Sequence, residues 1–246
     1  MRTTRGGTAA VAALAAVAMP MATVVQTAPV SAARGDSMPG HLPYAETDAA
    51  TLTTVPAGFA VGQPCRVRVA MLPDLMRLLE DEAAAGLGET LHAVSCFRSV
   101  AHQRAVFCRT AAGCADVQRR AVTVGPPGRS EHATGYAIDF AVRPARGCAD
   151  VSDCIAETAA GRWLLANAPA YGFELSFPAG NAQGVAYEPW HWRWAGTSQD
   201  EPGAAEARAT LAEARMHYPA RPEEAGFALH ATARAEPPGT VATPDL

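Results

Sequence analysis

The spacing of apolar residues predicts a first helix that begins at Pro73. Proline is common at the first position of a helix, because the N–H that it lacks has no partner there. The apolar residues that follow share one helical face, which runs towards the breakers Gly86 and Gly88 and consists of Leu75, Met76, Leu78 and Leu79. We therefore expect an amphipathic helix with one buried side.

Three further helices are expected. Ser99 is a suitable N-cap for a helix that runs to residue 108. A longer helix is predicted over residues 156–171, ended by Gly172, with an inward-facing group formed by Trp163, Leu164 and Leu165. Residues 206–217 are rich in Ala with interspersed Arg and Glu, which is typical of a surface helix.

Short apolar segments predict strands at residues 91–97, 137–142, 173–177 and 190–195. In the second segment Ile138 lies opposite in phase to Asp139. In the fourth, Trp190, Trp192 and Trp194 alternate, which indicates one strand face that fills a core rather than a sugar-stacking platform. Because helices and strands mix without a regular βαβ repeat, the expected fold class is α+β, with a small central antiparallel sheet flanked by helices.

The first 33 residues have the layout of a secretory signal peptide. Arg2 and Arg5 precede an uninterrupted apolar run over residues 9–19, and small residues follow at Ser31, Ala32 and Ala33. A membrane anchor is disfavoured, because Pro20 breaks the run before it reaches the roughly 20 apolar residues of a spanning helix. We expect an exported protein, periplasmic or extracellular, with no stable membrane anchor after cleavage.

Export would place the six cysteines in an oxidising compartment, where an even number favours disulfides. Proximity along the chain suggests two local loops and one remaining pair: Cys108 with Cys114, Cys148 with Cys154, and Cys65 with Cys96. A zinc site built from cysteines is disfavoured, because the sequence contains no Cys-x-x-Cys pair.

Length and composition favour a single compact domain with tails. The chain has 246 residues, of which 49% are apolar, and this excludes a wholly disordered protein. Its basic residues are all arginine, and the net charge of -4 provides no basic field for DNA or RNA. We expect a linker or arm over residues 34–60, one folded domain over residues 61–200, and a surface helix with a flexible tail over residues 201–246. We also expect a monomer.

Two short segments carry candidate chemistry. They are residues 130–139 (Ser-Glu-His-Ala-Thr-Gly-Tyr-Ala-Ile-Asp) and residues 188–193 (Glu-Pro-Trp-His-Trp-Arg). Together they contain three candidate metal ligands: His132, Asp139 and His191. A catalytic zinc site typically has three such ligands and keeps an open position for water. Glu188 is a suitable carboxylate to take a proton from that water and return it to a leaving amine.

Taken singly, these residues would more often have structural roles. A lone His is usually a packed or surface residue, and an Asp at the end of a strand is usually a turn former. The combination is far more specific than its parts. Glu188 and His191 would face opposite sides of a regular strand, but Pro189 indicates an irregular entry that can turn both inward.

From about residue 65 to residue 196 the sequence resembles the VanY-type D-alanyl-D-alanine carboxypeptidases. The resemblance rests on the two segments, which match Ser-x-His-x-Thr-Gly-x-Ala-x-Asp and Glu-Pro-Trp-His-x-Arg. Further matches are Ser-Cys-Phe-Arg-Ser at residues 95–99, Gln103, Trp-Leu at 163–164 and Tyr-Gly-Phe at 171–173. This family belongs to the zinc metallopeptidase group that includes lysostaphin-like enzymes and the hedgehog signalling domain.

The resemblance implies a single catalytic domain with a Zn²⁺ ion and three protein ligands: His132, Asp139 and His191. It implies that Glu188 is the catalytic base, and that Arg98 holds the substrate carbonyl and the developing oxyanion, a task suited to a fixed cationic donor. It also implies that Gln103 and Ser130 contact the peptide substrate. Without the resemblance, a surface ion pair, a solvated helix residue and a loop hydroxyl would be the simpler interpretations of Arg98, Gln103 and Ser130.

Two features depart from the family pattern. Cys96 and Phe97 precede Arg98 where the family often has Gly-Tyr, so a disulfide would replace some local packing near the site. Residues 108–128 carry Cys and Gly and are suited to form a lid or rim that sets specificity.

The expected function is removal of a terminal D-alanine from peptidoglycan stem peptides by a cell-wall-associated enzyme. A peptidoglycan endopeptidase or a D,D-dipeptidase is the alternative within the enzyme class. From a different class, the chain could be a non-catalytic, zinc-stabilised binding module, but Glu188 and Arg98 argue against this because a structural site needs neither. Adhesion through the arm and tail is a third idea, for which the sequence shows no binding motif.

Overall fold

The computed structural model describes residues 40–110 and 114–220. Their strands are β1 (Leu52–Thr54), β2 (Arg66–Arg68), β3 (Thr90–Ser95), β4 (Ala137–Arg143), β5 (Phe173–Leu175) and β6 (His191–Trp194). Their α-helices are α1 (Leu72–Ala84), α2 (Val100–Phe107), α4 (Val117–Ala121), α5 (Ala159–Asn167), α6 (Ala204–Thr210) and α7 (Ala212–His217). The predicted signal peptide and the predicted tail beyond residue 220 lie outside the described residues.

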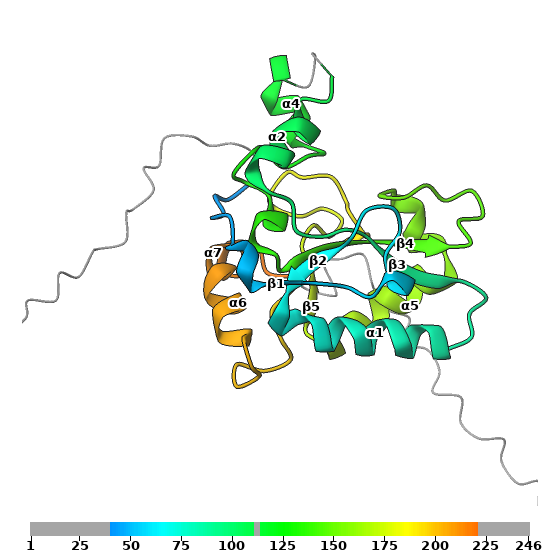
Figure 1. Cartoon of the computed structure of the whole chain (residues 1–246). Helices are drawn as coiled ribbons and strands as arrows, with labels where there is room; N and C mark the ends of the chain where they lie inside the picture. Colours follow the sequence, from blue (N-terminus) through cyan, green and yellow to red (C-terminus); the bar gives the residue numbers. More distant parts are fainter. Residues whose placement is uncertain (1–39, 111–113, 221–246) are drawn as a thin grey trace, which may run out of the picture. The chain divides into compact units, whose positions relative to one another are not determined.

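Two antiparallel sheets organise the fold. The larger sheet has four strands in the order β3-β4-β6-β5, and the smaller one pairs β1 with β2. Helices α1 and α5 contact each other and strand β3 (Figure 1). The predicted α+β class, with a small antiparallel sheet flanked by helices, is confirmed.

The first predicted helix forms as its pattern indicates. Pro73 lies in the first turn of α1, and Leu75, Leu78 and Leu79 are fully buried in the core. At α2, the hydroxyl of Ser99 accepts a hydrogen bond from the backbone N–H of His102 and caps the helix as predicted.

Two predicted helices are divided in the structure. The segment 156–171 contains α5 between two 3-10 helices, Asp153–Glu157 and Ala168–Tyr171. Thr158 is extended and caps α5, while Pro169 has no N–H to continue the α-helical hydrogen bonding. The segment 206–217 contains the end of α6 and all of α7, which meet at the fully buried Leu211.

Part of the predicted arm belongs to the folded unit. In residues 40–60, strand β1 pairs with β2 and Val55 is buried in the core. The backbone N–H of Tyr44 donates to Gly128 and that of Thr47 donates to Ala133, so this segment runs beside the first chemical motif.

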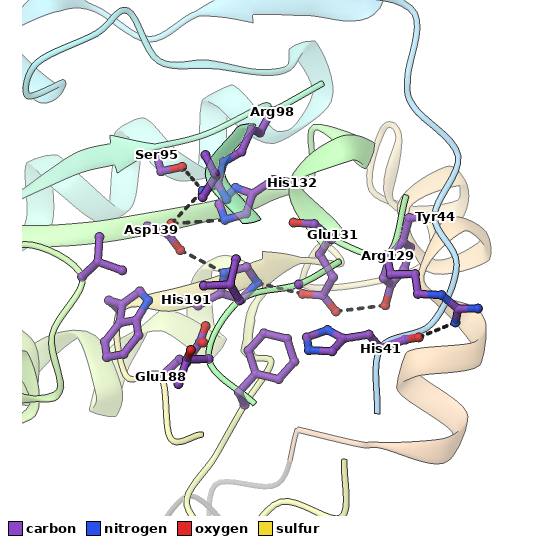
Figure 2. Close-up of a pocket in the computed structure, with 18 of the residues that line it drawn as sticks. His41, Tyr44, Ser95, Arg98, Arg129, Glu131, His132, Asp139, Glu188 and His191 are labelled. Carbon is purple, nitrogen blue, oxygen red and sulfur yellow. Dashed lines mark hydrogen bonds and ion pairs between the residues drawn. The ribbon is translucent and has the colours of Figure 1, made fainter. Parts of the chain in front are cut away.

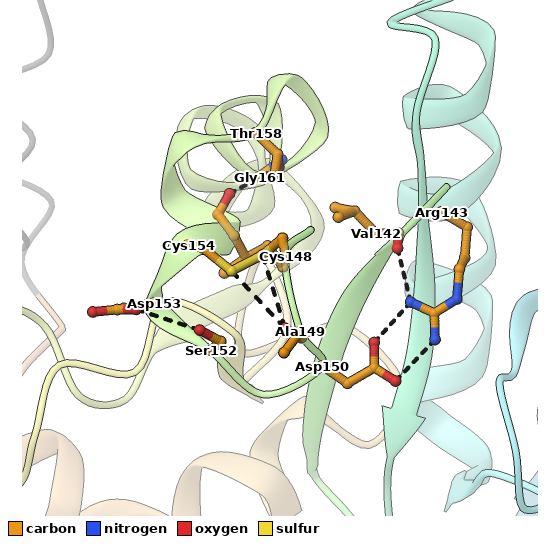
Figure 3. The surroundings of a disulfide bond; sticks show 11 residues. Val142, Arg143, Cys148, Ala149, Asp150, Ser152, Asp153, Cys154, Thr158 and Gly161 are labelled. Atoms are coloured by element: carbon orange, nitrogen blue, oxygen red, sulfur yellow. Dashed lines mark hydrogen bonds and ion pairs between the residues drawn. A yellow bond between two sulfur atoms is a disulfide. The ribbon is translucent and has the colours of Figure 1, made fainter. Parts of the chain in front are cut away.

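All three predicted disulfides are present. They join Cys65 to Cys96, Cys108 to Cys114, and Cys148 to Cys154. Beside the last of these, Arg143 makes a two-pronged ion pair with Asp150 at 2.7 and 2.8 Å (Figure 3). None of the helices described here has the length and apolar character needed to cross a membrane.

Candidate active site and metal centre

Strand register brings two of the candidate ligands together. Asp139 on β4 is the direct cross-strand partner of His191 on β6, and Ser95 on β3 is the partner of Asp139 on the other side. Directly paired residues of antiparallel strands project to the same face. Three strands therefore place these side chains in one row.

The third candidate ligand comes from the short 3-10 helix Glu131–Thr134, which precedes β4. Gly135 ends this helix with φ of 74°, and an added side-chain carbon there would lie 2.7 Å from Leu52. The turn leads the chain back into β4, so that His132 and Asp139 meet. The Nδ1–H of His132 donates to the carbonyl of Cys96 at 2.7 Å, which leaves Nε2 to face the site.

His132, Asp139 and His191 form a compact donor cluster (Figure 2). Nε2 of His132 lies 3.2 Å from Oδ2 of Asp139, and Nδ1 of His191 lies 2.9 Å from Oδ1 of the same carboxylate. One ligand atom from each residue lies within 4.8 Å of the others, and all three residues are buried. Two imidazoles and a carboxylate are the donor set that suits zinc, so the residues fit a divalent metal ion.

The protonation of each residue in the cluster depends on the charges of its neighbours. Burial opposes ionisation of Asp139, but interactions with His132 and His191 outweigh it and hold the pKa of Asp139 well below its usual range. Burial lowers the pKa of His132. Burial also lowers the pKa of His191, but its hydrogen bonds to Asp139 and Glu131 outweigh this effect and raise the pKa to about 10. His191 is thus held by carboxylates on both ring nitrogens.

Glu188 lies in a turn immediately before β6. The backbone N–H of His191 donates to the carbonyl of Glu188 at 3.0 Å, so the intervening residues Pro189 and Trp190 form a tight turn outside the strand. Both Glu188 and His191 line the same pocket. Burial, together with the nearby carboxylates of Asp139 and Glu131, raises the pKa of Glu188 to about 8 against the opposing charges of His191 and Arg98.

Arg98 is fixed next to the cluster by three partners. Its guanidinium donates to the hydroxyl of Ser95 and to Oε1 of Gln103, the latter at 2.8 Å, and lies 3.5 Å from Asp139. Gln103 is buried and donates its own amide N–H to the carbonyl of Gly125 at 2.6 Å. Arg98 lines the pocket, whereas Gln103 contacts Arg98 without lining the pocket itself.

The pocket around these groups has a volume of about 470 Å³. Ser130 is buried and lines it, as does Trp190. Trp192 and Trp194 are buried in the core as their alternation predicts. Trp190 precedes the strand, packs half-buried against the core and also lines the pocket. The pocket therefore contains every candidate site residue except Gln103.

Glu131 is a site residue for which the sequence analysis assigned no role. Its carboxylate accepts hydrogen bonds from Nε2 of His191 at 3.0 Å, from the buried Arg193 at 3.2 Å, from the hydroxyl of Ser176 and from Tyr44. Burial opposes its ionisation, but His191 and Arg193 hold the pKa of Glu131 well below its usual range. A carboxylate that accepts from a metal-binding His orients its ring. The sequence signal that could have identified Glu131 is its position directly before His132 in the first chemical motif.

A buried His–Asp–His cluster that shares a pocket with a carboxylate and a fixed arginine is typical of metal-dependent hydrolases. Comparison with known families agrees with this class. The family model for VanY, D-alanyl-D-alanine carboxypeptidase, matches residues 65–197, which is more than half of the chain. The chain belongs to the VanY family, and the resemblance expected from its motifs is confirmed.

Individual relatives match parts of the chain. YodJ of Bacillus subtilis (strain 168), which is named as a carboxypeptidase, is 35% identical over 118 residues, or 47% of this chain and 42% of that protein. The bifunctional D-Ala-D-Ala dipeptidase and D-Ala-D-Ala carboxypeptidase VanXYC of Enterococcus gallinarum is 33% identical over 75 residues, or 30% of this chain and 40% of that protein. The matches thus cover about two fifths of these curated relatives.

The fold is also found among solved structures. The LdcB LD-carboxypeptidase has a TM-score of 0.54 and 24% sequence identity to this chain, and the match covers 68% of this chain and 79% of that one. This similarity shows a shared fold.

Proposed function

We propose that this protein is a zinc-dependent D-alanyl-D-alanine carboxypeptidase that removes the terminal D-alanine from peptidoglycan stem peptides. The observation that carries the proposal is the convergence of the donor cluster, Glu188 and Arg98 on one pocket. Membership of the VanY family supports it. We further propose that the protein is exported and cell-wall associated, which its three disulfides support because such bonds persist in oxidising compartments.

His132, Asp139 and His191 would hold the zinc ion through Nε2, a carboxylate oxygen and Nδ1, respectively. The ion, when bound, supplies Lewis-acid activation of water and of the scissile carbonyl. The Nδ1–H of His132 stays on the Cys96 carbonyl, and the Nε2–H of His191 stays on Glu131, so each ring presents its other nitrogen to the ion.

Glu188 would move the proton. As a buried carboxylate with a raised pKa, it is suited to accept a proton from the attacking water and to deliver it to the leaving amine. Its place in the turn before β6 keeps the carboxylate inside the pocket and next to His191.

Arg98 would stabilise the negative charge that develops on the carbonyl oxygen during attack. Its guanidinium is positioned by Ser95 and Gln103 before substrate binds, so little reorganisation is needed. Through this contact Gln103 would act as a positioning residue for Arg98. Ser130, which lines the pocket, would contact the peptide directly.

The direct test uses a pentapeptide stem ending in D-Ala-D-Ala, analysed by mass spectrometry with and without a chelator. Chelator-sensitive loss of a single alanine is the expected result. The relative from Enterococcus gallinarum is named as both a dipeptidase and a carboxypeptidase, so a D,D-dipeptidase is the second candidate. Release of the intact dipeptide would establish that activity instead, and internal cleavage would indicate an endopeptidase. Absence of any cleavage by zinc-loaded protein would leave a non-catalytic binding module.

A further inference from the structure

The pocket extends from the donor cluster to a second wall formed by α2, α4 and the segment that follows α4. Three arginines line the pocket on this side: Arg109, which follows α2, Arg120 on α4, and Arg129, which precedes the first chemical motif. We call these three residues the arginine rim. Residues 108–128 are the segment expected from the sequence to set specificity, and Arg109 and Arg120 lie within it, with Arg129 directly after it.

The positive charges of the rim are not compensated by neighbouring carboxylates. Arg120 donates to the carbonyls of Phe107 and Val106, each at 3.3 Å. Arg129 donates to the carbonyl of His41 at 2.8 Å (Figure 2). Arg109 is exposed. Within residues 40–110 and 114–220, no carboxylate lies within 4.0 Å of any rim guanidinium, whereas Arg98 is paired with Asp139.

Negative charge in the pocket is concentrated elsewhere. Asp139 belongs to the donor cluster, and Glu131 and Glu188 lie beside it. Asp150 also lines the pocket, but it is ion-paired with Arg143. The pocket therefore has an acidic end, suited to a metal ion, and a basic end. In a protein of net charge -4, a basic pocket end points to an anionic ligand.

Two of the three rim side chains, Arg120 and Arg129, are held in place before any ligand binds. The two carbonyls that accept from Arg120 belong to the last turn of α2, so this side chain ties α4 to α2. The Cys108–Cys114 disulfide closes the chain next to Arg109. A preorganised guanidinium group loses little freedom when it binds a carboxylate, and its planar fork matches the two carboxylate oxygens.

We propose that the arginine rim is an anion subsite that binds a carboxylate of the peptide substrate and selects peptides that carry it. The proposal rests on the proposed peptidase function and adds a preference for anionic peptides to it. The carboxylate has two sources in such a peptide, the free C-terminus and a carboxylate within the stem. Both present the same chemistry to a guanidinium group.

Binding of three synthetic pentapeptides to zinc-loaded Glu188→Gln protein, measured by calorimetry, tests the proposal. One peptide has a free stem carboxylate and a free C-terminus, the second has the stem carboxylate amidated, and the third has the C-terminus amidated. In this background, Arg109→Gln should weaken binding of the first peptide about fivefold. One of the two amidated peptides should bind equally with and without Arg109, and its identity shows which carboxylate contacts the rim. Arg109→Lys should retain part of the affinity, and Arg109→Glu should lose more than Arg109→Gln.

Arg104→Gln is the matched control, because Arg104 is an exposed arginine on α2 that does not line the pocket. Equal weakening of all three peptides by Arg109→Gln, an equal effect of Arg104→Gln, or no effect of either would overturn the subsite. Turnover of the first peptide by protein that retains Glu188 separates the two proposals. Cleavage with the same KM in the wild type and in Arg109→Gln overturns the subsite alone, whereas absence of both binding and cleavage overturns the proposed function as well.

Discussion

The two ends of the pocket are built in different ways. At the acidic end, paired residues of β4 and β6 hold Asp139 and His191 in direct register, and the surrounding side chains are buried in a network of charged hydrogen bonds. At the basic end, Arg120 lies on the short helix α4, whereas Arg109 and Arg129 lie outside the α-helices. Backbone carbonyls hold Arg120 and Arg129, and a disulfide closes the chain next to Arg109. The sheet positions reacting groups to within hydrogen-bond distances, whereas the rim can vary without disturbing them.

Because the two ends are built differently, substitutions at each end should change different measurable quantities. Changes at the acidic end should alter metal binding or the rate of the chemical step. Changes at the basic end should alter the affinity for particular peptides and leave the chemical step intact.

The largest effect is expected for Glu188→Gln. An amide cannot accept the proton, so kcat should fall by about 10²- to 10⁴-fold while zinc stays bound. Peptide turnover and metal content of the same preparation measure the two quantities. A variant that keeps full activity would exclude Glu188 as the base.

The same substitution should also change stability in a pH-dependent way. Burial raises the pKa of Glu188 from 4.5 in its ordinary state to about 8. The stabilisation due to its protonated form is present below about pH 4.5 and is lost as the pH rises through about 8. Metal-free Glu188→Gln should therefore unfold at a higher temperature than the metal-free wild type at pH 8, and the difference should shrink towards pH 5. An unchanged difference across this range would contradict the buried position of the carboxylate.

The second prediction concerns Glu131→Gln. The amide keeps the shape but loses the charge that holds the Nε2–H of His191, so zinc affinity should fall about 10- to 100-fold. Competition with a chromophoric chelator measures this affinity independently of turnover.

Glu174→Gln is the control for the buried charge network around Glu131. Glu174 accepts from Arg193, as Glu131 does, and from Arg215, but not from His191. This variant should lose stability and retain the zinc affinity of the wild type. Equal losses of zinc affinity in both variants would mean that the network acts on folding and not on the orientation of His191.

The third prediction is a pH dependence of metal binding. Because two carboxylates raise the pKa of His191 to about 10, its ring carries an extra proton at neutral pH and must release it to bind an ion through Nδ1. Zinc affinity should therefore rise about tenfold per pH unit between pH 6 and 8, with release of about one proton. Calorimetry in buffers of different ionisation enthalpy counts that proton. Release of no proton would contradict the protonated state of His191.

The sequence could predict features that depend on local interactions, but not those that depend on contacts between distant segments. The position of helix α1 and its buried face follow from local periodicity, and the capping of α2 by Ser99 follows from local chemistry. The donor cluster was predictable because its members lie in two short, specific motifs. The pairing of Asp139 with His191 depends on strand register between segments about 50 residues apart, which no local pattern contains. The division of the 156–171 helix follows from the Thr158 cap and from Pro169, which are local signals, whereas α4 is too short to produce a periodic signal.

The smallest effects are expected from opening the two local disulfides, which provide a matched pair. Each closes a sequence separation of 6 residues, so Cys108→Ala/Cys114→Ala and Cys148→Ala/Cys154→Ala should each cost about 2 kcal/mol of stability. Only the first pair adjoins Arg109 of the rim. Its loss should raise KM for the carboxylate-bearing peptide about twofold to threefold more than for its amidated analogue, with kcat unchanged. The second pair should affect both peptides equally, because its loop carries no rim arginine and the charge of Asp150, which it brings to the pocket, is compensated by Arg143. A reversed pattern, with the charge-dependent change in the second variant, would place peptide selection on the opposite wall of the pocket.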